Sequence, residues 1–352
     1  MRLFTGNHPM YRNVPLILAI GLLAFITSNP ASARKSHREE TPRAISSTTC
    51  FDPSDARDIL LWRGRAPGAV GDDACRDIPF VREYVPADGE TAGQPAILII
   101  PGGGYDHLTD AREQEPVAQH FADAYHVKAF VLYYRLVQDN GTYRYPVPMW
   151  DGRRALNLLR HDAGRLGIDP ERIGLFGFSA GGHLASTLAL HPDSDFGMPV
   201  HDAIDAVNAR PYFLGLGYPV ISMLPSQYAS PNSLKHLLNG YSGGELDRLE
   251  HELSSQDHVT SATPPVFLFE SMDDQRISAQ NSVMFANALQ AAGVQADVHL
   301  FRHGEHGAGL AEGIPEEEAW PDMFGHWLAA RGFIGTAAQP DDTRHHRRHE
   351  DR

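Results

Sequence analysis

A serine lies between glycines in the sequence FGFSAGGHLAS, which covers residues 176–186. The apolar residues before the serine are typical of a buried strand, and the residues after it, rich in Ala and Leu, are typical of a helix. A serine at such a sharp turn has a strained backbone and an exposed hydroxyl, which is the arrangement called a nucleophile elbow. We therefore predict that Ser179 is a nucleophile, and that Gly177 and Gly181 lack side chains because strand and helix pass closely there.

A serine hydroxyl becomes a good nucleophile only when a histidine takes its proton and a carboxylate orients that histidine. In chains with a nucleophile elbow, the acid and then the histidine follow the serine in sequence. Asp273 and Asp274 follow the predicted strand 266–269. We favour Asp274 as the acid because it stands three residues before the apolar Ile277, while Asp273 has the position of a turn residue and stays open as the alternative.

Two histidines follow the predicted strand 296–301, in the sequence RHGEHGAGL. His303 comes almost directly after the strand, whereas His306 lies in a loop flanked by glycine. We favour His306 as the base that takes the proton of Ser179. Its position after Asp274 agrees with the order expected for this kind of triad.

Three consecutive glycines follow the apolar run ILII, in the sequence ILIIPGGGYDHL. A loop without Cβ atoms lets backbone N–H groups approach a developing oxyanion. We predict that Gly103, Gly104 and, at the start of the helix after the serine, Ala180 donate these hydrogen bonds. A phosphate-binding loop is disfavoured because neither a Lys-Ser/Thr ending nor a complete GxGxxG is present.

Strand and helix patterns alternate along the chain, which predicts an α/β fold with a mostly parallel sheet and helices on both faces. In such sheets functional groups gather at the carboxyl ends of the strands. The predicted strands are 80–85, 96–100, 129–134, 173–176, 212–216, 266–269 and 296–301. The predicted helices are 115–125, 151–166, 180–190, 279–292 and 317–330. Residues 222–264 interrupt this alternation, and they form either a small cap or an ordinary surface excursion.

The chain has 352 residues, of which 42% are hydrophobic, and a formal net charge of −14. This acidity argues against nucleic acid as a partner. No motif requires a cofactor, and the histidines near the C-terminus lack the spacing of a built metal site, so we expect neither a cofactor nor a metal. The composition leaves the oligomeric state open.

The two ends of the chain differ from the rest in composition. Residues 1–33 combine early arginines, a short apolar run and a small-residue ending, which predicts a signal peptide cleaved after Ala33 and leaves no membrane span in the mature protein. An uncleaved anchor is the alternative. We expect a loose leader over 34–49, a catalytic domain over 50–335 and a disordered tail over 336–352.

Cys50 and Cys75 are the two cysteines of the chain, and both belong to the segment expected to be exported to the periplasm or the outside. Because that compartment permits disulfides, we predict that they pair. Two free thiols are the alternative, since pairing does not follow from sequence.

Residues 61–328 resemble the α/β-hydrolase superfamily. Within it they resemble the acetylxylan-esterase-like and bacterial feruloyl-esterase-like (BD-FAE type) serine esterases. The matching pieces include IIPGGGY, YPVPMWDGRRAL, RIGLFGFSAGGHLAS, the SMDD loop and HGEHGAGL. Many relatives carry His-Gly where this chain has Glu270 and Ser271, and often Pro where it has Ser278. Pro101 replaces the His of the HGGG form of the glycine loop, and proline is common there in this subgroup.

The resemblance implies an α/β-hydrolase fold and a serine esterase of short acyl esters, with Ser179, Asp274 and His306 as its triad. It also implies a carbohydrate ester such as acetylated xylan as substrate. Aromatic side chains near predicted strand ends, Tyr105, Trp150 and Tyr218 among them, could stack on a sugar ring, although core packing explains them equally well. A peptidase or amidase of the same fold, or a binding protein without catalysis, are the alternatives.

Overall fold

An eight-stranded sheet runs through the part of the chain that the computed structural model describes, residues 49–335 without 90 and 110. The strands lie in the order β1-β2-β4-β3-β5-β6-β7-β8. β2 pairs antiparallel with β1 and β4, and all other neighbours are parallel, so the predicted mostly parallel sheet is confirmed. The strands are β1 (Asp58–Leu60), β2 (Phe80–Tyr84), β3 (Gln94–Ile100), β4 (Lys128–Tyr133), β5 (Ile168–Phe178), β6 (Leu214–Gly217), β7 (Val266–Ser271) and β8 (Ala296–Phe301).

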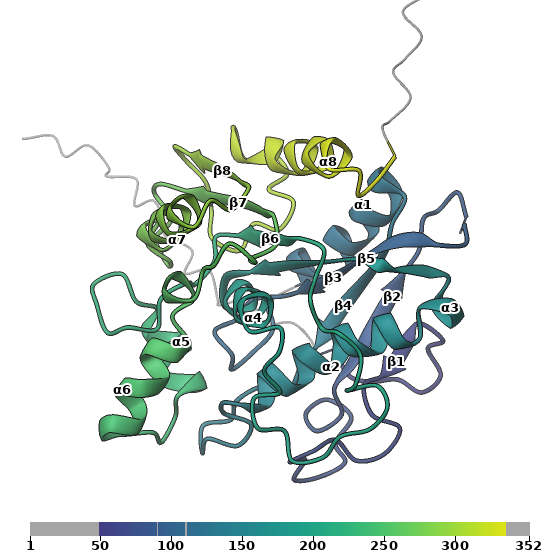
Figure 1. Ribbon diagram of the computed structural model, residues 1–352, viewed down its shortest axis with the longest axis horizontal. Coiled ribbons are helices and arrows are strands. Elements are labelled where there is room, and N and C mark those ends of the chain that lie inside the picture. Colours follow the sequence, from purple (N-terminus) through teal and green to yellow (C-terminus); the bar gives the residue numbers. More distant parts are fainter. Residues whose placement is uncertain (1–48, 90, 110, 336–352) are drawn as a thin grey trace, which may run out of the picture. The chain divides into compact units, whose positions relative to one another are not determined.

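Helices cover both faces of this sheet, with α1 and α8 on one face and α2, α4 and α7 on the other (Figure 1). Successive side chains of β3 explain the two layers, because Leu98 belongs to the core under α2 and α4, while Ile97 and Ile99 belong to the core under α1 and α8. The helices are α1 (Glu115–Tyr125), α2 (Val147–His161), α3 (Ala163–Leu166), α4 (Ser179–Leu190), α5 (Pro231–Leu237), α6 (Gly243–Glu252), α7 (Gln280–Ala291) and α8 (Trp320–Ala330). Short 3-10 helices are η1 (Ala111–Glu113), η2 (Ser255–Asp257) and η3 (Glu317–Ala319).

The structure corrects several predicted boundaries. The predicted helix 151–166 is two helices, because α2 begins four residues earlier and ends before Asp162, where α3 follows. Pro148 lies in the first turn of α2, where a missing N–H costs no helical hydrogen bond. β5 is longer than predicted at both ends, and β1 was missed because three residues are too short to show a periodic pattern.

Segment 222–264 forms α5, α6 and η2, of which α5 and α6 lie beside the layered core in Figure 1. It contacts the glycine loop after β3, since the Nδ1 of His236 is 3.2 Å from the carbonyl oxygen of Gly104. It also contacts α4, where the Nε2 of His183 is 2.7 Å from the carbonyl oxygen of Leu253. The segment therefore packs on two elements next to the serine.

Cys50 and Cys75 form a disulfide, as predicted. The predicted signal peptide, the tail and all but the last residue of the predicted leader lie outside the described residues. Among the helices of residues 49–335, none has the length and apolar character needed to span a bilayer.

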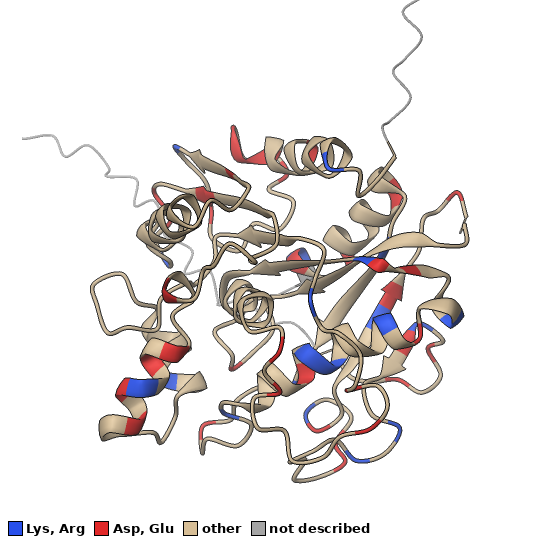
Figure 2. Cartoon of the chain, viewed as in Figure 1, with Lys and Arg blue, Asp and Glu red and all other residues tan. Residues whose placement is uncertain are grey.

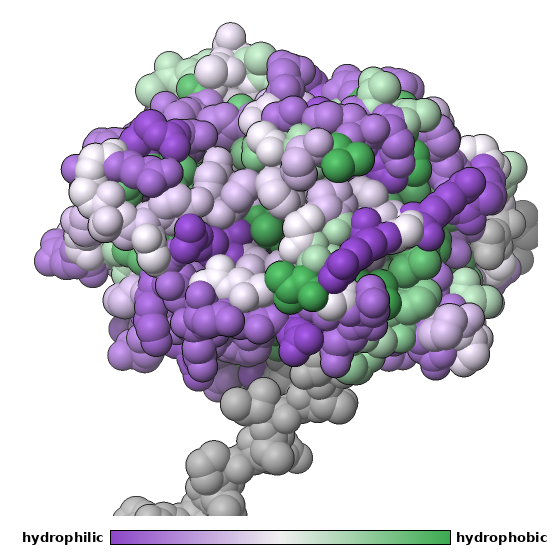
Figure 3. All heavy atoms as spheres, turned by 90° about the horizontal axis from the view of Figure 1, so that it is seen from below, coloured by the Kyte–Doolittle hydropathy of each residue, from purple (hydrophilic) through white to green (hydrophobic). Residues whose placement is uncertain are grey.

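Charged residues of both signs are distributed over the helices and loops, whereas β3 and β6 in the centre of the sheet carry none (Figure 2). The face seen in Figure 3 shows hydrophobic residues in small groups between hydrophilic ones. The apolar side chains of the strands are buried between the helical layers, and their burial stabilises the fold.

Candidate active site

Ser179 is the first residue of α4 and follows directly on β5, so the turn predicted from the sequence is present. Its φ angle is +51°, in the left-handed region that non-glycine residues rarely adopt. A Cβ atom on Gly177 would collide with the backbone oxygen of Gly181, and one on Gly181 would collide with that of Ile100. Both glycines are therefore needed for the close approach of α4 to β5 and β3.

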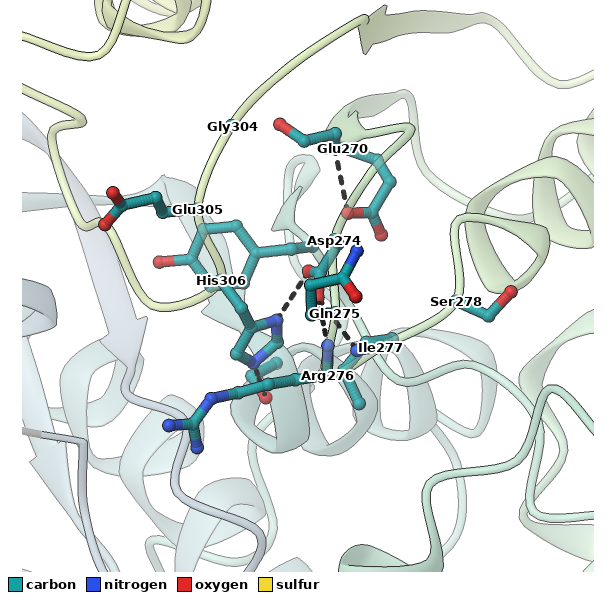
Figure 4. A network of polar contacts seen from close by, with 12 residues as sticks. Glu270, Asp274, Gln275, Arg276, Ile277, Ser278, Gly304, Glu305 and His306 are labelled. Atoms are coloured by element: carbon teal, nitrogen blue, oxygen red, sulfur yellow. Dashed lines mark hydrogen bonds and ion pairs between the residues drawn. The ribbon is translucent and has the colours of Figure 1, made fainter. Parts of the chain in front are cut away.

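His306 and Asp274 continue a chain of hydrogen bonds from Ser179 (Figure 4). The Nδ1 of His306 lies 2.7 Å from Oδ2 of Asp274, and its Nε2 lies 2.9 Å from Oγ of Ser179. An ionised carboxylate can only accept, so Nδ1 carries the hydrogen, and Nε2 of the neutral ring is left to accept from the serine hydroxyl. The Asp274 side chain is 1% exposed, and that of His306 is 12% exposed.

Backbone N–H groups hold the acid in place. The Oδ1 of Asp274 accepts from the N–H of Arg276 at 2.7 Å and from the N–H of Ile277 at 2.9 Å. Its other oxygen remains directed at His306. The loop after β7 thus fixes the orientation of the carboxylate, and with it the ring of His306.

The alternative residues Asp273 and His303 form a separate pair. The Nδ1 of His303 lies 2.7 Å from Oδ2 of Asp273, and the N–H of Gly304 donates to Oδ1 of Asp273. The two side chains are 61% and 46% exposed, respectively. The hydroxyl of Ser179 is hydrogen-bonded to His306 and not to this pair.

The glycine loop after β3 packs against the serine, because a Cβ atom on Gly102 would lie only 2.7 Å from the Cβ of Ser179. The N–H of Gly102 donates to the Oε2 of Glu113 at 2.7 Å. The N–H groups of Gly103 and Gly104 have no protein acceptor among the described residues. Ala180 is the second residue of α4, and the first N–H groups of a helix lack acceptors within it. The backbone N–H groups of all three predicted donors are therefore without an acceptor among the described residues.

A buried polar network, absent from the sequence predictions, connects the glycine loop to the histidine loop. The hydroxyl of Tyr218 donates to Oε1 of Glu113 at 2.9 Å and accepts from the N–H of Gly309 at 3.1 Å. The ring of Tyr218 contacts that of His306, with 4.9 Å between their centres. Burial raises the pKa of Glu113 above its ordinary value, against the opposing effect of these hydrogen bonds. Nothing in the sequence distinguishes Glu113 from surface carboxylates.

The aromatic residues suggested for sugar stacking are buried. The hydroxyl of Tyr105 is 2.6 Å from Nδ1 of His183, and the Nε1 of Trp150 donates to the carbonyl oxygen of Phe196 at 2.9 Å. Tyr218 lies beneath His306 in the network described above. The structure thus corrects the suggestion for all three, because their polar atoms and ring surfaces are used inside the protein.

Two further carboxyl groups are buried near the acid loop. Glu270 accepts from the N–H of Ser271 at 2.9 Å, and Glu317 accepts from the N–H of Glu305 at 2.9 Å. Burial, with the nearby charge of Asp274 as a lesser cause, raises the pKa of Glu270 well above its ordinary range and that of Glu317 to about 7. Glu270 lies near the end of β7, so one of these buried carboxyl groups stands directly before the acid loop.

Comparison with known proteins places this arrangement in a family. The family model BD-FAE matches residues 83–289. The chain belongs to the BD-FAE family. The chain is 37% identical in sequence to the acetyl ester-xyloside bifunctional hydrolase from Caldicellulosiruptor lactoaceticus, and its fold matches the crystal structure of that protein with a TM-score of 0.70. The match covers 79% of this chain and 97% of that one. The expected α/β-hydrolase fold is thereby confirmed.

Two proteins with longer chains are also similar in sequence to this one. The chain is 28% identical to an acetylxylan esterase of Xylanibacter ruminicola over 238 residues, which are 66% of this chain and 45% of that protein. It is 31% identical to endo-1,4-beta-xylanase B of Butyrivibrio fibrisolvens over 217 residues, 61% of this chain and 32% of that protein. The chain thus spans less than half the length of either relative.

Proposed function

We propose that this protein is a serine esterase that hydrolyses short acyl esters, acetyl esters of carbohydrates in particular. The observation that carries the proposal is the unbroken chain of hydrogen bonds from Ser179 through His306 to Asp274. It lies at the carboxyl ends of β5, β7 and β8, where functional groups of parallel sheets gather. Similarity to an acetylxylan esterase and to an acetyl ester-xyloside hydrolase supports a carbohydrate ester as the substrate.

In the proposed mechanism His306 takes the proton of Ser179 while Oγ attacks the ester carbonyl carbon. The N–H groups of Gly103, Gly104 and Ala180 donate to the oxyanion. His306 then protonates the leaving alcohol, and an acyl-enzyme remains on the serine. The same histidine activates water, which releases the carboxylic acid, while Asp274 stabilises the positively charged ring in both steps.

We also propose that the protein works outside the cytoplasm, in the periplasm or secreted. The disulfide between Cys50 and Cys75 supports this, since such bonds persist in oxidising compartments. The signal-peptide pattern over residues 1–33, with cleavage after Ala33, supports it as well. N-terminal sequencing of the protein recovered from the exporting host tests the cleavage position.

Hydrolysis assays test the activity. The mature protein and its Ser179→Ala variant are compared on 4-nitrophenyl acetate, butyrate and octanoate, and on acetylated xylan with acetate release as the readout. We expect serine-dependent turnover that favours the acetyl ester and includes release of acetate from xylan. Circular dichroism of the variant checks whether it is folded.

Other outcomes have distinct meanings. Turnover that persists in Ser179→Ala would remove this serine from the mechanism. A folded wild-type protein that cleaves none of the esters contradicts the proposal. Amide and peptide substrates then distinguish a peptidase or amidase from a binding protein without catalysis.

A further inference from the structure

A polar cavity of about 350 Å³ lies beside the acid of the triad. Gln227 and Tyr228, from the segment before α5, line one side. The acid loop lines the other with Met272, Asp274 and Arg276. The cavity therefore adjoins the loop that carries the triad acid, and it is large enough for part of a substrate.

Arg276 brings a positive charge to this cavity that no described residue neutralises. Its side chain is exposed and forms no ion pair within the described part of the chain. The nearby carboxylates are engaged elsewhere, since Asp274 binds His306 and Asp273 binds His303. In the view of Figure 4, the guanidinium group and the carboxylate of Glu305 lie on different sides of His306.

The backbone of Arg276 has a fixed position. Its N–H donates to the Oδ1 of Asp274 at 2.7 Å. The guanidinium group therefore extends from an anchored point two residues from the triad acid. A side chain anchored in this way can hold a ligand group at a defined place relative to the reacting bond.

The mechanism determines which part of the substrate lies on this side. His306 has to protonate the oxygen of the leaving alcohol, so the alcohol part of the ester lies next to His306 and the acid loop. This step rests on the proposed function. For an acylated carbohydrate, the sugar and not the acyl group would then face the cavity beside Arg276.

We propose that Arg276 binds a carboxylate on the alcohol part of the substrate, which makes acidic carbohydrates, those with a uronic acid group, the preferred esters. A guanidinium group donates two parallel hydrogen bonds to a carboxylate. The net charge of −14 repels anions from the protein as a whole, so an anionic substrate needs a local cation to be held. The polar lining around Arg276 suits the hydroxyl groups of a sugar.

Two matched pairs of substrates test this. One pair is 4-acetoxybenzoate and its methyl ester, and the other is acetylated xylo-oligosaccharides with and without their uronic acid groups. The wild-type protein is compared with Arg276→Gln, Arg276→Lys and the control Arg165→Gln. Arg165 lies in α3, just before β5 begins, whereas Ser179 follows the other end of β5. Loss of Arg165 changes the net charge by the same amount as loss of Arg276.

The measured quantity is the ratio of kcat/KM for the acidic ester to that for the neutral ester. We expect this ratio to fall about tenfold in Arg276→Gln, the size expected for a lost hydrogen bond to a charged group. We expect Arg276→Lys to keep part of the wild-type ratio and Arg165→Gln to keep all of it. Added salt should lower the ratio in the wild-type protein. A ratio that stays within about twofold of the wild-type value in Arg276→Gln overturns the inference. Failure of the wild-type protein on all four esters would instead overturn the proposed function.

Discussion

The hydroxyl of Tyr218 donates a hydrogen bond to the buried carboxyl group of Glu113 over 2.9 Å. Glu113 also accepts from Gly102 in the glycine loop, and Tyr218 accepts from Gly309 in the histidine loop. The loop proposed to bind the oxyanion and the loop that carries His306 are therefore connected through two buried side chains. Glu113 lies in η1 and Tyr218 directly follows β6, so these two positioning residues come from parts of the chain that are far apart in sequence.

Tyr218→Phe removes the hydroxyl and leaves the Glu113 carboxyl group and the Gly309 N–H without that partner. Because unsatisfied buried polar groups are costly, we expect the free energy of unfolding to fall by about 1 to 3 kcal/mol. We also expect kcat to fall more than KM rises, since the loop that carries His306 loses its hydrogen bond from Gly309 to the hydroxyl of Tyr218. Chemical denaturation and steady-state kinetics measure the two effects. Tyr212→Phe, which removes a hydroxyl on the surface, is the control, and an equal loss in both variants would refute the role of the network.

Asp274→Asn tests the choice between the two neighbouring aspartates. An amide can donate to Nδ1 of His306, which favours the wrong tautomer of the ring. We expect kcat to fall by a factor on the order of ten thousand, the loss known for the same change in a serine protease triad. Asp273→Asn disturbs an equally short contact, but one to the exposed His303, and should change kcat by less than about threefold. The reverse ranking of the two variants would assign the triad acid to Asp273.

Glu317→Gln tests the buried carboxyl group whose pKa is about 7 in the folded protein, compared with 4.5 as its ordinary value. Between these values the folded state binds more protons than the unfolded state, so the free energy of unfolding decreases as the pH rises from 4.5 to 7. The amide cannot ionise, so we expect the variant to be about 2 kcal/mol more stable than the wild-type protein above pH 7, relative to their difference at pH 5.

Thermal unfolding at several pH values measures this difference. Glu312→Gln, an equal change of charge at an exposed position, serves as the control. A stability difference between Glu317→Gln and the wild-type protein that does not vary with pH would show that Glu317 keeps its ordinary ionisation in the folded protein.

Gly181→Ala tests the close contact between α4 and β3. The added Cβ would collide with the backbone oxygens of Ile100 and Pro101, which cannot move without disturbing the sheet. We expect a loss of at least about 2 kcal/mol in the free energy of unfolding, or no folded protein. Gly164→Ala in α3, where the Cβ meets open space, should be neutral or stabilise by up to about 1 kcal/mol. Similar melting temperatures for the two variants would contradict the collision.

Reduction of the bond between Cys50 and Cys75 should lower the free energy of unfolding by about 2 to 4 kcal/mol, chiefly because the unfolded chain gains freedom. Denaturation with and without reductant measures the loss. Mass spectrometry after alkylation supplies the check on the bond itself. Two alkylated cysteines in the mature, unreduced protein would contradict the disulfide.

The sequence by itself determined the features that depend on neighbouring residues. The turn at Ser179 needs only a strand, glycines and a helix in succession, so it could be predicted together with the alternation of strands and helices. The triad candidates could be chosen because each follows a predicted strand, and loops at the carboxyl ends of parallel strands meet at one edge. These features depend on short stretches of sequence, in which the spacing of apolar residues indicates a helix or a strand.

Only the tertiary structure decided which polar groups meet. Asp273 and Asp274 are adjacent, yet they bind different histidines, because successive residues of the loop point in different directions. Glu113 and Tyr218 are 105 residues apart and meet only when the loops converge. Burial of Tyr105, Trp150 and Tyr218 likewise depends on what packs over them, which no pattern of neighbours along the chain contains.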